Sequence, residues 1–228
     1  MVLPKPLVPV GDRPILDLIL RQLGHDGYRH VDLCVGHLGA LIQTYFSDPR
    51  NVPEGMTLDY QWEDEPLGTA GALKQLSDID APFLVMNGDI LTDLCYRSLM
   101  DHHVETGASL TIATHQVDHQ VALGVIEQDA GMVTGYTEKP TLHYHVSMGV
   151  YVYNPSVLDH IPEGQFDFPD VVNELLGAGE PVASYPFDGN WFDIGTPGDH
   201  DRAVAHIQDN PGSLLRGAGP VAASTEPA

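Results

Sequence analysis

The chain has few cysteines and no long apolar run. Only Cys34 and Cys95 occur among its 228 residues, which excludes a disulfide framework as the basis of the fold. Both follow or lie within apolar runs, and we expect them to be small buried side chains in a reducing compartment. No stretch approaches the roughly 20 apolar residues of a membrane span, and no basic-then-apolar leader is visible. The sequence predicts a cytoplasmic protein that does not enter a membrane.

Positive charge is also scarce. Ten Lys and Arg residues stand against 32 Asp and Glu residues, for a formal net charge of -22. Such a surface repels nucleic acid and anionic lipid, so we expect neither as a partner. An anionic small substrate needs a metal ion or a local positive cluster to approach. Because the chain has only the lysines Lys5, Lys74 and Lys139, their positions are informative.

The first half alternates between helical and strand patterns. Apolar spacing predicts a helix over 13–23, with Asp12 as its N-cap, and a continuous apolar run over 82–89 suits a strand buried on both faces. Such alternation is typical of an α/β fold with a Rossmann-like, mostly parallel sheet flanked by helices. Further helices are expected over 38–46 and from 71 to 76, and further strands over 30–36 and 57–62.

The second half is richer in strands. Strands are expected over 109–115, 122–128, 132–139 and 146–154, and helices over 168–176 and 198–207. We therefore divide one domain, 1–209, into a first half at about 1–107 and a β-rich half at about 108–209. The segment 210–228 is small, rich in Pro and Gly, and aperiodic, which predicts a disordered tail.

Two aspartates follow apolar segments. Asp89 ends the buried run in "MNGD", and ligands of open α/β sheets bind at the carboxyl ends of strands. Asp193 in "NWFDIGTP" lies between bulky apolar residues, where a carboxylate needs a partner. Carboxylate oxygens suit Mg²⁺. Taken alone, each stretch favours a structural role over metal binding: Asp89 as a cap or turn after the strand, and Asp193 as a carboxylate paired within the protein.

Two further stretches suggest ligand contacts. In "EPLGTAGAL", small residues remove side chains where a loop meets a helix start, which lets an anionic ligand reach the helix N–H groups. The alternative is a small-residue turn that serves close packing. In "TEKP", the neighbouring Glu138 and Lys139 can contact a sugar hydroxyl and a phosphate, or form a solvated ion pair.

Together and in this order, the motifs carry a resemblance. "PKPLVPVGDRPIL", "EDEPLGTAGAL", "LVMNGD", "EKP", "SMGVY" and "WFDIGTP" closely resemble the sugar-1-phosphate nucleotidyltransferases, over about residues 3–208. The similarity is greatest to the branch of mannose-1-phosphate and heptose-1-phosphate guanylyltransferases. It implies the nucleotide-diphospho-sugar transferase fold and the transfer of a nucleotidyl group from a nucleoside triphosphate (NTP) to a sugar 1-phosphate, with Mg²⁺.

In that family a first strand and a loop of the form G-G-x-G-T-R-L precede the Pro-Lys-Pro segment. The printed sequence holds no such loop. We expect that Met1 marks a start assigned too far downstream; a truly shorter chain is the alternative. By the resemblance the strand is central, so its neighbours should have unpaired backbone and a slot should lie between them.

The resemblance also implies residue roles. Asp89 and Asp193 correspond to the carboxylates that hold Mg²⁺, and Lys5 to the lysine that neutralises the phosphates. Lys139 corresponds to the lysine on the sugar phosphate, and Glu138 to the acceptor of a sugar hydroxyl. The sugar-binding set is Gly124, Glu138, Lys139, Ser147 and Gly149, and the nucleotide-binding set is Glu63, Leu67, Gly68, Thr69 and Gly88; Lys5, Asp89 and Lys139 form the catalytic group.

The choice of base is argued from Glu63, which aligns near the family's base reader. An ionised carboxylate only accepts hydrogen bonds, and guanine offers two adjacent donors, so Glu63 favours GTP over UTP or dTTP. A plain surface acid is the alternative.

Other function classes remain open at this point. They are a metal-dependent glycosyltransferase and a non-catalytic binding or regulatory homologue. A homo-oligomer is a further possibility.

Overall fold

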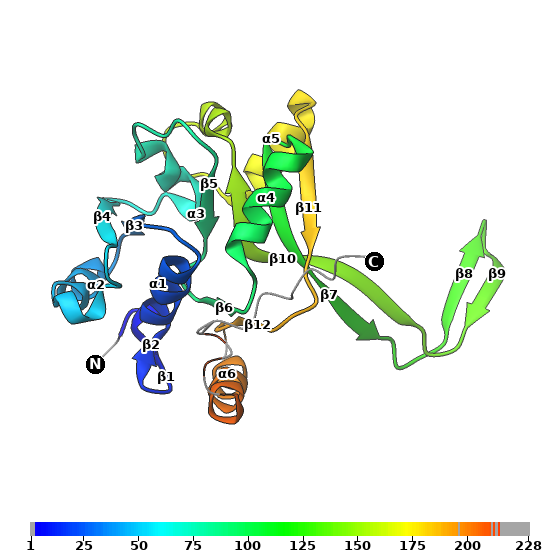
Figure 1. The fold of residues 1–228 in the computed structure, drawn as a ribbon. Coiled ribbons are helices and arrows are strands. Elements are labelled where there is room, and N and C mark those ends of the chain that lie inside the picture. The colour runs from blue at the N-terminus through cyan, green and yellow to red at the C-terminus, as the bar shows by residue number, and fades with distance from the viewer. Residues whose placement is uncertain (1–2, 196, 211, 213, 215–228) are drawn as a thin grey trace, which may run out of the picture.

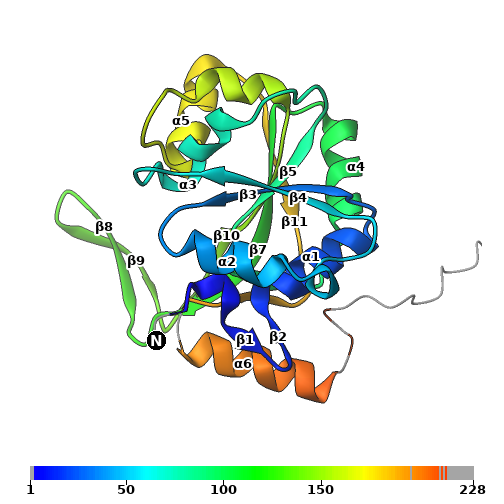
Figure 2. The same cartoon turned by 90° about the vertical axis from the view of Figure 1, so that its left-hand side faces the viewer.

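The computed structural model describes residues 3–195, 197–210, 212 and 214. Its helices and strands form layers: α1 and α2 lie on one side of the β3–β4 pair, and α3 and α5 lie on the other (Figures 1 and 2). The helices are α1 (Ile15–His25), α2 (Gly39–Phe46), α3 (Gly68–Gly71), α4 (Tyr96–Thr106), α5 (Phe168–Ala178) and α6 (Pro197–Asp209), with 3-10 turns at Lys5–Leu7, Pro49–Asn51, Ala72–Gln75 and Pro155–His160. The strands are β1 (Pro9–Val10), β2 (Arg13–Pro14), β3 (His30–Val35), β4 (Thr57–Trp62), β5 (Phe83–Met86), β6 (Ile90–Thr92), β7 (Leu110–Gln120), β8 (Val125–Asp129), β9 (Met132–Thr137), β10 (Thr141–Tyr153), β11 (Val182–Pro186) and β12 (Trp191–Asp193).

The sheet is mixed, and the α/β class expected from the sequence is confirmed. Its largest part has the order β11-β7-β10-β5, in which β11 and β7 are parallel while β10 is antiparallel to both neighbours. The antiparallel strand arises because β10 returns directly from the hairpin that follows β7. Strands β3 and β4 form a separate parallel pair.

A slot separates the two parts of the sheet. Among the described residues, β3 pairs only with β4, and β5 pairs only with β10. Between β3 and β5 lies a cavity of about 490 Å³ whose lining is mostly apolar, including Leu20, Leu33, Leu84 and Met86. This is the slot that the resemblance implies, with one unpaired strand edge on either side.

The burial of β5 and of the two cysteines differs from the expectation. Every residue of β5 is only half-buried, not enclosed on both faces, because one edge of the strand borders the cavity. Cys34 on β3 is exposed and Cys95 is half-buried, so the expectation that both thiols are buried is wrong.

The start of the first long helix also differs from the expectation. Arg13 and Pro14 pair with Pro9 and Val10 as a short hairpin, so α1 begins at Ile15 and Asp12 does not cap it. Pro14 occupies the N-cap position and makes no side-chain cap.

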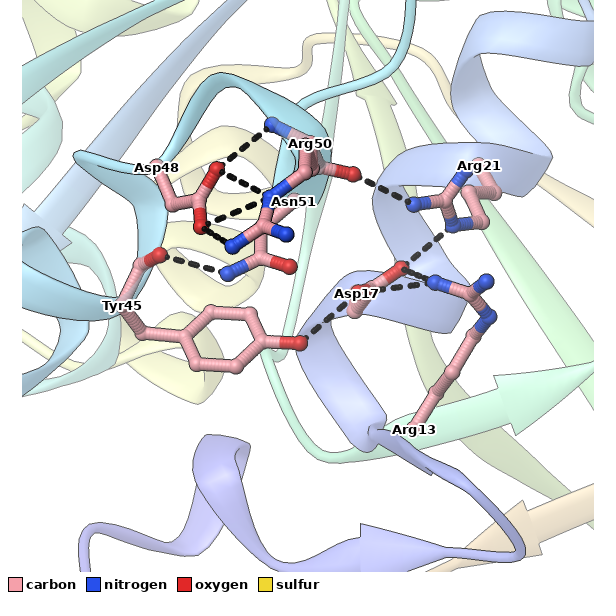
Figure 3. A network of polar contacts seen from close by, with 7 residues as sticks. All are labelled: Arg13, Asp17, Arg21, Tyr45, Asp48, Arg50 and Asn51. Carbon is pink, nitrogen blue, oxygen red and sulfur yellow. Dashed lines mark hydrogen bonds and ion pairs between the residues drawn. The ribbon is translucent and has the colours of Figure 1, made fainter.

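A buried carboxylate joins α1 to α2. Asp17 is fully buried and is contacted by Arg13 at 3.3 Å, Arg21 at 2.5 Å and the Tyr45 hydroxyl at 2.9 Å (Figure 3). The two arginines lie four residues before and after it on the same helix face. Burial, together with the hydrogen bond to Asp17, raises the pKa of Tyr45 to about 12. The network satisfies a charge that would be costly to bury alone.

A two-stranded arm stands away from the body. Strands β8 and β9 form it, and both views show it projecting beyond the rest of the molecule (Figures 1 and 2). The backbone N–H of Val121 donates to the carbonyl of Pro140 at 2.9 Å and closes its base. Several of its large apolar side chains are exposed: Leu123, Ile126, Met132, Val133 and Tyr136.

Most of the tail predicted over 210–228 lies outside the described residues. Of that segment, only 210, 212 and 214 are described. Leu214 is buried, and its carbonyl accepts a hydrogen bond from the Gln22 side chain, so this residue belongs to the core. Within the described part of the chain, every helix is too short or too polar to traverse a bilayer.

Candidate active site

A strand pairing brings Asp89 and Asp193 together. Asp89 lies in the turn that follows β5, and β6 begins at the next residue. Strand β12 pairs with β6 so that Asp193 is opposite Ile90, and the N–H of Ile194 donates to the Asp89 carbonyl at 3.2 Å. The structure therefore places two carboxylates from distant parts of the sequence at one edge of the sheet.

Lys5 joins the two carboxylates. It lies in the 3-10 turn Lys5–Leu7, and Pro6 of that turn packs against Gly88. The Lys5 ammonium donates a hydrogen bond to Asp89 Oδ2, and it lies 4.0 Å from Asp193 Oδ1. Three of the residues singled out in the sequence thus form one cluster.

The electrostatics of this cluster favour a cation. Partial burial and the neighbouring charge of Asp89 raise the pKa of Asp193, and the Lys5 ammonium opposes that rise. A positive charge beside the two carboxylates stabilises the ionised form of Asp193. Their hard oxygens are the donors that Mg²⁺ prefers. The residues present therefore fit a divalent ion.

A bulge in β10 lies beside the cluster. The register of β10 against β7 shifts between Ser147 and Tyr151, as at many functional sites. Gly149 in this bulge has φ +74°, and a Cβ there would lie 2.8 Å from the Asn87 amide. Its carbonyl accepts from the Asn87 N–H at 2.9 Å. Ser147 and Gly149 are thereby held next to the turn that carries Asp89.

The slot gathers most of the predicted nucleotide-binding residues. Glu63, Gly68, Thr69 and Gly88 all line the cavity between β3 and β5. Leu67 is tied to them because its N–H donates to Glu63 Oε2 at 3.1 Å. Gly88 lines the cavity and Asp89 is the next residue, so the cavity borders the carboxylate cluster.

The N–H groups at the start of α3 are already bonded. Those of Ala70 and Gly71 donate to the Phe166 carbonyl at 3.0 Å, and that of Thr69 donates to Asp167 Oδ1 at 2.8 Å. The idea that these groups point outward to an anion is therefore wrong. A Cβ on Gly68 would lie 2.6 Å from the Phe166 carbonyl oxygen. Close packing explains this glycine.

The arm carries the remaining predicted residues away from the cluster. Gly124 packs under the Tyr136 ring, and Glu138 forms an exposed ion pair with Lys139 at 3.8 Å. Both charged residues precede β10, whose ladder with β7 runs from Thr141 to Ser147 before reaching the bulge. Six residues of strand span about 20 Å. The structure does not bring Glu138 and Lys139 to Asp89.

Comparison with known protein families identifies the family of this chain. The model of the family described as nucleotidyl transferase matches residues 1–210. The chain belongs to the nucleotidyl transferase family. The assignment made from the sequence motifs is confirmed.

Curated relatives of this chain are named as transferases that act on sugar 1-phosphates. The chain is 31% identical over 225 residues to a UTP–glucose-1-phosphate uridylyltransferase of Synechocystis, and the match covers 90% of this chain and 58% of the relative. It is 30% identical over 208 residues to a mannose-1-phosphate guanyltransferase of Candida albicans, covering 87% of this chain and 57% of the relative. The chain thus spans less than two thirds of their length.

Solved structures share the fold. HddC from Yersinia pseudotuberculosis complexed with GMP-PN superposes with a TM-score of 0.70 at 23% identity, over 90% of both chains. A putative glucose-1-phosphate thymidylyltransferase from Bacillus anthracis gives 0.70 at 22% identity, covering 90% of this chain and 87% of that one. The chain therefore has the expected architecture.

Sequence reasoning missed the residues that hold the candidate site in place. The Asn190 side chain and N–H both donate to Asp93 at 2.8 Å, which clamps β12 beside β6 and thus positions Asp193. Asp167 holds Thr69, and Asn87 supports the bulge. Their signal is weak, because each is a single polar residue in a loop and acts through a partner far along the chain.

Proposed function

We propose that this nucleotidyl transferase transfers a guanylyl group from GTP to mannose 1-phosphate, or a similar sugar 1-phosphate, and releases pyrophosphate. The observation that carries the proposal is the cluster of Lys5, Asp89 and Asp193 next to the cavity lined by Glu63. Such a transfer needs positive charge at the phosphates, which a cation held by the two aspartates and the Lys5 ammonium would supply.

The reaction needs little covalent chemistry from side chains. An oxygen of the sugar phosphate forms a bond to the α-phosphorus of GTP, and the bond from that phosphorus to the bridging oxygen breaks. Pyrophosphate carries away the electron pair. Asp89 and Asp193 would hold Mg²⁺, which supplies charge neutralisation at the phosphates. The Lys5 ammonium would contribute a second positive charge at the phosphates.

The sugar 1-phosphate is proposed to bind next to the β10 bulge. Ser147 and the backbone of Gly149 lie beside the turn that carries Asp89, so a sugar held there is close to the cation. The proposed contacts of Glu138 and Lys139 with the sugar and its phosphate require the arm to approach the body from its position in Figure 1.

A coupled assay tests the proposal directly. The purified chain is incubated with Mg²⁺ and each pair of GTP, UTP or dTTP with mannose 1-phosphate or glucose 1-phosphate, and both pyrophosphate and nucleotide sugar are measured. We expect one of each product per turnover, with GTP preferred. Consumption of a finished nucleotide sugar without pyrophosphate would indicate a glycosyltransferase. Binding of GTP without product from any pair would indicate a binding homologue and contradict the proposal.

Glu63 is proposed to choose the base. Leu67 N–H fixes one of its carboxylate oxygens, and the carboxylate lines the cavity. The two adjacent donors of guanine match a carboxylate, whereas uracil and thymine present one donor between two acceptors. The GMP-PN complex of the Yersinia structure is compatible with a guanine nucleotide in this fold.

Glu63→Gln should change the preference between bases. An amide presents one acceptor and one donor, so one guanine donor loses its partner and faces another donor. We expect kcat/KM for GTP to fall about 10- to 100-fold, with that for UTP unchanged or raised. Steady-state kinetics with both nucleotides measure the ratio. Glu65→Gln is the matched control, because Glu65 is an exposed acid two residues away; an equal effect of both variants would refute the role of Glu63.

A further inference from the structure

The Lys5 ammonium occupies the position that a cation between the two aspartates would take. It is hydrogen-bonded to Asp89 Oδ2 and lies 4.0 Å from Asp193 Oδ1. The Asp89 side chain is mostly shielded, at 23% exposed, so its charge needs a partner within the protein. Lys5 is that partner in the structure.

A divalent ion and this ammonium cannot share the position. Both are cations that seek the same carboxylate oxygens, and two like charges at that separation repel. The Lys5 side chain is 42% exposed, which leaves it free to move toward solvent. Its backbone is fixed, since the Val8 N–H donates to the Lys5 carbonyl at 3.0 Å. Exchange therefore needs only a change of side-chain rotamer.

We infer that Lys5 plugs the divalent-ion site of the nucleotide-free protein and is displaced when the ion arrives with the triphosphate. The inference rests on the proposed function, and it adds a second role for this residue. Before binding, the ammonium compensates Asp89 and Asp193. After binding, it compensates the phosphates brought in with the ion. The ion alone must compete with the plug, whereas the ion with a nucleotide offers Lys5 a new partner.

Titration with Mn²⁺ tests the plug without any turnover. Free Mn²⁺ is measured by electron paramagnetic resonance as it is added to the purified chain in the absence of nucleotide. Lys5→Met should bind Mn²⁺ about tenfold more tightly than the unmodified chain, because the competing charge is gone. The same variant should bind GTP in the presence of Mn²⁺ more weakly. These opposite signs are not expected of a merely structural residue.

Three controls keep the result interpretable. Lys5→Arg retains the positive charge and should bind Mn²⁺ within about twofold of the unmodified chain. Arg50→Gln removes an equal charge from an exposed ion pair with Asp48 and should also have no effect beyond about twofold. Circular dichroism confirms that each variant is folded.

Mn²⁺ binding and pyrophosphate release together distinguish a failure of the Lys5 inference from a failure of the proposed transfer. Unchanged or weaker Mn²⁺ binding by Lys5→Met overturns the plug, even if the chain makes nucleotide sugar. Tighter Mn²⁺ binding together with no pyrophosphate from any substrate pair supports the plug and contradicts the proposed transfer. Mn²⁺ binding that survives in Asp89→Asn contradicts the metal assignment on which both depend.

Discussion

Replacing Asp89 with Asn is expected to lower kcat for nucleotidyl transfer by about a thousandfold or more. The change keeps the size of the side chain but removes a negative charge from the cluster with Lys5 and Asp193. An amide is a weaker ligand than a carboxylate for a hard divalent ion, and Lys5 then keeps only its 4.0 Å ion pair with Asp193. Pyrophosphate release at saturating GTP and Mg²⁺ measures the effect.

The matched control for this variant is Asp188→Asn. Asp188 is an exposed acid between β11 and β12, so the same chemical change is made outside the cluster. We expect its kcat to stay within about twofold of the unmodified chain. If Asp89→Asn retains more than a tenth of the activity, the carboxylate does not hold the ion.

Replacing Asp17 with Ala is expected to lower the free energy of unfolding by about 3 kcal/mol. The change leaves the guanidinium groups of Arg13 and Arg21 and the Tyr45 hydroxyl without their shared acceptor. Both arginines are about one third exposed, so water recovers part of the loss. Urea denaturation followed by circular dichroism measures it.

Two comparisons isolate the network. Asp201→Ala at an exposed position of α6 should cost no more than about 0.5 kcal/mol. Tyr45→Phe should destabilise the unmodified chain but have almost no further effect in the Asp17→Ala background, because its acceptor is already gone. Equal effects of Tyr45→Phe in both backgrounds would show that the hydroxyl does not act through Asp17.

Local patterns were enough to predict most helices and strands. Strands β3 and β4 and helices α2 and α5 match the predicted ranges closely, because their apolar spacing is regular and their ends are marked by polar or small residues. The start of α1 was misplaced because the Pro9–Pro14 hairpin is held by pairing between strands, which local propensity does not encode.

The candidate site was predictable only through the order of its motifs. Asp89 and Asp193 each read as a local turn or cap, and it is the pairing of β6 with β12 that makes them neighbours. The clamp of Asp93 by Asn190 leaves no periodic signal. The position of the arm was not predictable either. Its strands were predicted, but their distance from the body depends on the length of the β7–β10 ladder.

The buried carboxylate had a signal that was overlooked. Asp17 sits between Arg13 and Arg21 at intervals of four residues, a spacing that places all three side chains on one helix face. The helix was predicted from its apolar residues alone, and no role was assigned to Asp17. This spacing predicts ion pairs on one helix face, whereas the burial of Asp17 and its link from α1 to α2 come from the packing of Tyr45 against it.

Anomalous diffraction from crystals grown with Mn²⁺ and GTP tests the central claim most directly. The claim is that one divalent ion is shared by the two aspartates that the β6–β12 pairing brings together. We predict a manganese peak within bonding distance of carboxylate oxygens of both Asp89 and Asp193, with the Lys5 side chain turned toward the phosphates. A bound nucleotide whose metal lies elsewhere, with Lys5 still joined to Asp89, would contradict it.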